Sequence, residues 1–104
     1  MAKKSTNENI VSGKTSSGIQ FTLDKRIKDD ARLLFWLSRI QNEELSVMER
    51  NKALFSLLEL IFGSGEGLNV FLNEVAAKHD GIADITSLMN ELNDMFEALA
   101  IKNS

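Results

Sequence analysis

Apolar residues recur at helical spacing through most of the chain, and most clearly at its end. Over residues 85–99 the apolar positions follow one another at intervals of three and four residues for four turns. Asp84 stands directly before them, where a carboxylate can cap a helix N-terminus. This pattern predicts an amphipathic helix with one buried face, made of Ile85, Leu88, Met89, Leu92, Met95, Phe96 and Leu99.

Three more helices are predicted before this one, over residues 30–40, 46–62 and 68–79. The second opens with a Ser-x-x-Glu capping box formed by Ser46 and Glu49. Glycines follow the second and third helices, where the left-handed backbone that ends a helix favours them. The chain has no proline to interrupt any of these segments.

The helix predicted over 46–62 has more apolar surface than a small domain needs to bury. At 100° per residue its apolar positions cover an arc of roughly 240°, whereas an ordinary surface helix needs only about 100°. In the helix before it, Phe35 points away from the apolar face that Leu33, Leu34, Trp36, Leu37 and Ile40 share. The surplus indicates either a central helix or a second partner, and exposed aromatic and Met side chains often mark interfaces.

The N-terminal part of the chain has a different pattern. Residues 19–23 alternate apolar and polar side chains, which is typical of a short strand. A single strand is unstable, so it pairs with a segment around 82–85, pairs with another subunit, or is no strand. Residues 1–18 are rich in Ser, Thr, Asn, Lys and Gly and predict a disordered tail. The predicted fold is therefore mainly α, a small four-helix domain over 19–104 with a short N-terminal strand and a disordered tail.

Composition narrows the classes of function. The 104 residues suit one domain, and the formal charge of −3 argues against a protein built mainly to grip nucleic acid. Without cysteine the chain can form neither disulfides nor thiolate metal sites. Its longest apolar run, 33–37, is far shorter than a membrane span, and no apolar segment follows the basic start as in a secretory signal. We therefore expect a cytosolic protein.

Motifs that suggest chemistry are incomplete. Gly13-Lys14-Thr15 matches the end of a P-loop, but Glu8 occupies the position of the first glycine. His79 and Asp80 are adjacent, and neighbours on a helix rarely face each other, so we expect His79 to pack at a helix end. The carboxylates Asp24, Asp29, Asp30, Glu43 and Glu44 lack the spacing of a metal site. We expect no catalytic, cofactor-binding or metal-binding residues, and an enzyme using Asp24, Asp29 and Asp30 is the weakest hypothesis.

An alternative function rests on a cluster of basic residues. Lys25, Arg26, Lys28 and Arg32 follow a basic N-terminal tail, which is compatible with a small helical nucleic-acid-binding regulatory protein. No aromatic residues are interleaved with the cluster to stack on bases, and no nucleic-acid module signature is present. A solvated surface is the simpler interpretation of these charges.

The order of these segments resembles the small tail assembly chaperones of long-tailed phages and prophages of Gram-positive bacteria. The similarity covers about residues 17–104 and is one of order, length and hydrophobic pattern. It begins with Ser17-Gly18-Ile19-Gln20-Phe21-Thr22-Leu23-Asp24, then Asp29-Asp30 and Leu33-Leu34. It continues with Leu57-Leu58-Glu59-Leu60-Ile61-Phe62-Gly63, Phe71-Leu72, His79-Asp80-Gly81 and the closing Lys102-Asn103-Ser104.

The resemblance implies a non-enzymatic protein of the host bacterial cytoplasm that is absent from the finished virion. Such chaperones coat the tape measure protein, keep it soluble and help to recruit tail tube subunits. The family has no catalytic residues and no cofactor to carry over. The surplus apolar helix surface agrees with a chaperone function, because such a surface can cover an amphipathic client helix or another copy of the chain. The residues predicted to contact a partner are Phe35, Trp36, Phe55, Phe62 and Phe71.

Overall fold

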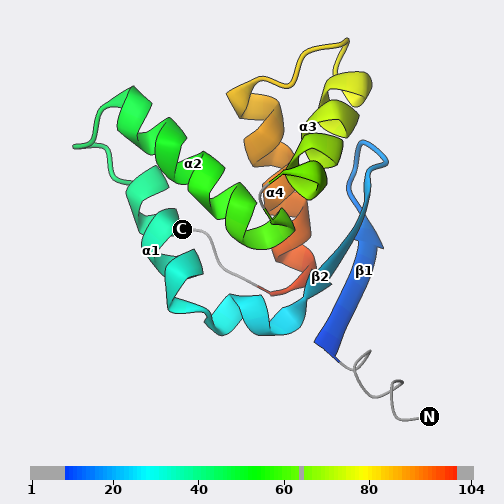
Figure 1. Ribbon diagram of the computed structural model, residues 1–104, viewed down its shortest axis with the longest axis horizontal. Coiled ribbons are helices and arrows are strands. Elements are labelled where there is room, and N and C mark those ends of the chain that lie inside the picture. Colours follow the sequence, from blue (N-terminus) through cyan, green and yellow to red (C-terminus); the bar gives the residue numbers. More distant parts are fainter. Residues whose placement is uncertain (1–8, 64, 101–104) are drawn as a thin grey trace.

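The chain forms a β-hairpin followed by four α-helices (Figure 1), in a computed structural model that describes residues 9–63 and 65–100. The elements are β1 (Ile10–Lys14), β2 (Gln20–Asp24), the 3-10 helix η2 (Lys25–Asp29), α1 (Ala31–Ile40), α2 (Val47–Phe62), α3 (Glu66–Lys78) and α4 (Ile85–Ala98). The helix α1 packs along α2, while α3 and α4 lie on the other side of α2 next to the hairpin (Figure 1). The predicted mainly α fold with four helices is confirmed.

The helix boundaries follow from local capping chemistry. Asp30 accepts a hydrogen bond from the backbone N–H of Arg32 at the start of α1. At the start of α2, the Ser46 hydroxyl accepts from the Glu49 N–H at 3.1 Å, and the Glu49 carboxylate accepts from the Ser46 N–H at 3.3 Å. This reciprocal pair is the predicted capping box. Asp84 caps α4 through the N–H of Ser87, also as predicted.

The hairpin corrects the prediction for the N-terminal tail. Residues 10–14 lie in the segment predicted to be disordered, yet they form β1 and pair antiparallel with β2, with Val11 opposite Leu23 and Gly13 opposite Phe21. The partner of the 19–23 strand is therefore neither the 82–85 segment nor another subunit. The prediction failed because a polar strand on a sheet edge has little apolar pattern, and its stability comes from backbone pairing with β2. Residues 1–8 of the predicted tail lie outside the described residues.

A single hydrophobic core joins the hairpin to all four helices. The strand β2 contributes Phe21 and Leu23, and Ile19 precedes it. The helices contribute Leu33, Leu37, Leu54, Leu57, Leu58, Phe71, Val75, Leu88, Leu92, Met95 and Phe96, with Leu99 after α4. The predicted apolar positions of the last helix are thus buried or pack against the core. Among the described helices, none is by itself long and apolar enough to cross a membrane; α2 and α3 reach that length and composition only as a pair bent by 114°.

Candidate protein-binding surface

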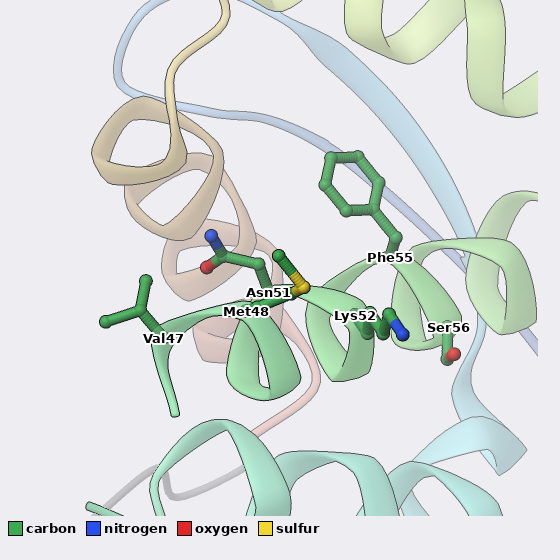
Figure 2. Close-up of a pocket in the computed structure, with 6 residues that line it drawn as sticks. All are labelled: Val47, Met48, Asn51, Lys52, Phe55 and Ser56. Carbon is green, nitrogen blue, oxygen red and sulfur yellow. The ribbon is translucent and has the colours of Figure 1, made fainter. Parts of the chain in front are cut away.

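Large apolar side chains are exposed to solvent along the first nine residues of α2. Val47 is 65% exposed, Met48 69% and Phe55 37%. They lie with three polar residues around an open groove, shown as sticks in Figure 2. We call this surface the α2 face; it consists of Val47, Met48, Asn51, Lys52, Phe55 and Ser56.

The α2 face follows directly from the helical period. At 100° per residue, Met48, Lys52 and Phe55 fall on one side of α2 over two turns. Ala53, Leu54, Leu57 and Leu58 fall on the opposite side and are buried in the core. Since one side alone is enough to attach α2 to the domain, the apolar side chains on the other side are the surplus that the sequence predicted.

Two further depressions adjoin the α2 face. One lies between α2 and the adjoining ends of α1 and α4 and shares Val47 and Asn51 with the α2 face. The other lies between α1 and α2 and shares Ser56 with it. They are lined respectively by Ile40, Val47, Arg50, Asn51, Leu54, Ile85 and Met89, and by Arg32, Trp36, Ser56, Glu59 and Leu60. The α2 face therefore lies in the middle of a continuous, uneven surface.

The structure separates the predicted contact residues into two groups. Phe35 is 54% exposed, as its off-face position predicted, and Trp36 packs edge-to-face against it with ring centroids 4.8 Å apart. The Arg39 guanidinium lies 5.9 Å from the Phe35 ring centroid. Phe35 and Phe55 are therefore available to a partner. Trp36 is only half-buried and lines the depression beside α1.

The other two predicted aromatics face the core. Phe62 and Phe71 stack with centroids 4.4 Å apart, and Phe71 is only 3% exposed. Phe71 is thus a core residue that attaches α3 to the end of α2, which corrects its assignment as a contact residue. Aromatic size alone does not distinguish burial from binding. On α2, the assignment omitted the exposed residues Val47 and Met48, although the wide arc already contained them.

A polar cluster ties the hairpin turn to α3 and α4, and sequence reasoning missed its centre. Glu91, on the otherwise apolar face of α4, is 3% exposed. Its Oε2 accepts a hydrogen bond of 2.5 Å from the Ser17 hydroxyl and lies 2.8 Å from Nε2 of His79. One turn further on, Asp94 accepts hydrogen bonds from the N–H and hydroxyl of Ser16. The signal in the sequence was an acidic residue inside the apolar period of 85–99.

Glu91 and its hydrogen-bond partners Ser17 and His79 hold the hairpin turn, α3 and α4 together, and we call this cluster the clasp. Ser17 and His79 both bond to the same carboxylate oxygen, so the imidazole does not lie between hydroxyl and carboxylate as in a serine hydrolase triad. Burial raises the pKa of Glu91, but hydrogen bonding from Ser17, Thr15 and His79 outweighs it and holds the pKa below its usual value. His79 therefore packs at the end of α3, as predicted, with Glu91 as its partner.

The two arginines of the basic cluster are paired within the chain. Arg26 Nη2 lies 2.5 Å from Asp24 Oδ2, and Arg32 Nη2 lies 2.7 Å from Asp30 Oδ2. The hydrogen bond from Arg26 lowers the pKa of Asp24 to about 2, and Arg32 likewise lowers the pKa of Asp30. Two of the three carboxylates proposed for an enzyme, Asp24 and Asp30, are thus partners of arginines. Within residues 9–63 and 65–100, no three His, Asp or Glu side chains converge in a way that could hold a metal ion.

Comparisons of the chain with protein families, with curated proteins and with solved structures found no match.

Proposed function

We propose that this protein is a non-enzymatic assembly chaperone that binds a helical segment of another polypeptide on the α2 face. The client proposed is the tape measure protein of a long-tailed phage, which the chaperone keeps soluble while tail tube subunits are recruited. It acts in the cytoplasm of the bacterial host.

The exposed apolar surface of α2 carries this proposal. Leaving Met48 and Val47 in water is unfavourable, and burying a side chain of this size is worth about 1.5–3 kcal/mol. The core does not need Met48, because the opposite side of α2 already fills it. Val47 lies on the same stripe as buried Leu54 and Leu58, but it is exposed as the first residue of the helix. An open groove with adaptable Met and Phe side chains next to polar neighbours suits the apolar stripe of an amphipathic helix. The order of helices that resembles the phage chaperones is the reason for naming this client.

Self-association is part of the proposal. An apolar surface that waits for a client is prone to aggregation unless another copy of the chain covers it. Phe35 and Leu34, each 54% exposed on α1, add a second apolar area for such contacts.

The alternative of nucleic-acid binding is not favoured. Asp24 and Asp30 pair with two of the four basic residues in the cluster, and Asp29 lies between Lys28 and Arg32 in the chain. A phosphate backbone would have to compete with these carboxylates for the arginines. A gel shift on phage DNA at low salt tests it; a complex that weakens steeply as salt rises would favour the alternative.

Co-expression with the tape measure protein of a long-tailed phage of Gram-positive bacteria tests the proposal. We expect the wild-type chain to raise the soluble fraction of that protein and to co-purify with it. Met48→Glu places a charge in the α2 face without touching the core, so we expect it to abolish both effects while the chain stays folded. A tape measure protein that is equally insoluble with and without the wild-type chain would contradict the proposal.

The matched control is Val70→Glu. Val70 is 49% exposed on α3 and does not line the α2 face, so the same charge at this position should leave client binding unchanged. Equal loss of binding in both variants would mean that added negative charge, rather than the lost apolar surface, is responsible.

A further inference from the structure

The outer side of α1 carries a second exposed apolar patch, separate from the α2 face. Leu34 and Phe35 are each 54% exposed, and Trp36 packs edge-to-face against the Phe35 ring. Neither Leu34 nor Phe35 lines the α2 face or the two depressions beside it. Because α1 buries Leu33 and Leu37 and packs along α2 at the edge of the molecule, its other side is open to a partner (Figure 1).

Free charges of opposite sign lie at the two ends of α1. Asp29 is exposed just before the helix, and Arg39 lies in its last turn. The Arg39 guanidinium is 5.9 Å from the centroid of the Phe35 ring, so this charge stands at the edge of the patch. Within residues 9–63 and 65–100, no ion pair includes Asp29 or Arg39, whereas Arg32 is paired with Asp30.

We infer that a second copy of the chain covers this patch, with the two α1 helices packed antiparallel about a two-fold axis between Leu34 and Phe35. The inference rests on the proposed function, of which self-association is part. It assigns that contact to α1, so that the α2 face stays open for the client. A two-fold contact of this kind requires a surface that is complementary to itself.

The patch meets this requirement in shape. At 100° per residue, Ala31 and Ser38 lie between Leu34 and Phe35 around the helix, so the four exposed residues form one stripe. In the antiparallel pair, Ala31 of each copy faces Ser38 of the other, and these small residues let the backbones approach. The Phe35 rings of the two copies then meet on one flank and the Leu34 side chains on the other. The Ser38 hydroxyl donates to the Phe35 carbonyl oxygen at 2.9 Å, so covering it leaves no donor unsatisfied.

Charge favours a second copy and sets its orientation. Residues 31–40 contain two arginines and no acidic residue, so a partner has to supply carboxylates. Antiparallel packing brings Arg39 of each copy to the end of the other α1, where Asp30 already neutralises Arg32 and the free charge is that of Asp29. Parallel packing would instead place Arg39 beside its own counterpart. Since each copy contributes only two large side chains, the contact is small, and we expect a dimer that dissociates on dilution.

Sedimentation velocity of the full chain over a range of concentrations tests the inference. The emission of Trp36, the only tryptophan of the chain, is a second readout, because Trp36 touches the Phe35 ring. We expect a monomer–dimer equilibrium, with a shift of this emission as the dimer forms. Leu34→Glu places a charge in the patch and should weaken the dimer at least about tenfold. The matched control Val70→Glu, on α3, should leave the dimer unchanged.

A charge swap tests the antiparallel orientation. Arg39→Glu and Asp29→Lys should each weaken the dimer about tenfold, because each removes two symmetric exposed ion pairs. The double variant should regain the wild-type affinity within about threefold, since the pairs form again with their signs exchanged. A double variant that does not recover contradicts the antiparallel arrangement. A chain that stays monomeric at every concentration, or a dimer that dissociates in Met48→Glu and not in Leu34→Glu, overturns the inference.

The same variants separate this inference from the proposed function. Leu34→Glu leaves the α2 face unchanged and should still solubilise the tape measure protein, whereas Met48→Glu should still dimerise. If the wild type is monomeric and yet solubilises its client, the α1 contact alone is wrong. If it dimerises through α1 while the client stays insoluble, the proposed function alone is contradicted.

Discussion

His79 and Glu91 meet where α3 turns back into α4, with Nε2 of the imidazole 2.8 Å from a carboxylate oxygen that is almost completely buried. The same oxygen accepts the hydroxyl of Ser17 from the turn of the hairpin. One buried charge thus joins three segments that are far apart in the chain. A buried carboxylate of this kind stabilises a fold only while its partners are present.

The clasp predicts a pH-dependent stability. Because its folded pKa lies below its usual value of 4.5, Glu91 contributes stability that is fully present above that pH and is lost as pH falls through the folded value. We expect the free energy of unfolding of the wild type to exceed that of Glu91→Gln by about 1–3 kcal/mol near neutral pH. This difference should shrink below about pH 4.5. Urea unfolding followed by the fluorescence of Trp36 measures both.

Other carboxylates with lowered pKa values, Asp24, Asp30 and Asp84, remain in both proteins, so only the difference between the two proteins reports on Glu91. A difference that stays constant from pH 7 to pH 3 would show that the charge of Glu91 does not contribute to folding.

A second prediction concerns the hairpin. Gly13 stands opposite Phe21, and a Cβ at Gly13 would lie 2.8 Å from the end of the Phe21 ring. Gly13→Val therefore displaces a buried ring and should lower the free energy of unfolding by about 1–3 kcal/mol. Ser12→Val, at the neighbouring exposed position, provides a β-branched control that should change stability little. Equal effects of both substitutions would contradict the position of the Phe21 ring.

The sequence predicted the helices well because their signals are local. Capping by Ser46 and Asp84 and the apolar period of 85–99 depend only on residues a few positions apart. The strand β1 and the clasp were missed because each depends on partners outside its own segment. Gly13 becomes part of a strand only when Phe21 is beside it, and Oε2 of Glu91 is bonded by Ser17 from the hairpin turn and His79 from the end of α3. The α2 face was half predicted. Its apolar excess is visible in sequence, whereas whether Phe55 or Phe71 stays exposed depends on where α3 packs.

A third prediction reverses the usual effect of glycine in a helix. Replacing a helical glycine by alanine normally stabilises a protein by about 1 kcal/mol. Gly67, in the first turn of α3, lies so close to the Phe62 carbonyl oxygen that an added Cβ would overlap it. We therefore expect Gly67→Ala to destabilise the chain by about 1–3 kcal/mol, measured by urea unfolding. The control Asn69→Ala changes an exposed residue of the same helix and should be neutral or slightly stabilising. If Gly67→Ala stabilises the chain instead, Gly67 does not lie against the Phe62 carbonyl oxygen, and the ends of α2 and α3 are further apart.

The last prediction separates residues that hold the fold from those that bind a partner, using two neighbours on α1. Leu33 is fully buried, so Leu33→Ala should lower the free energy of unfolding by about 2–5 kcal/mol. Phe35 is half exposed and touches mainly Trp36 and Arg39, so Phe35→Ala should cost less than about 1 kcal/mol. Partner binding should show the opposite order, with Phe35→Ala weakening self-association or client binding more than Leu33→Ala does. Light scattering and co-purification measure these two interactions, at a temperature where both variants are folded. Should Phe35→Ala instead leave both interactions unchanged, the exposed aromatic on α1 is no part of the binding surface, and the client contacts α2 alone.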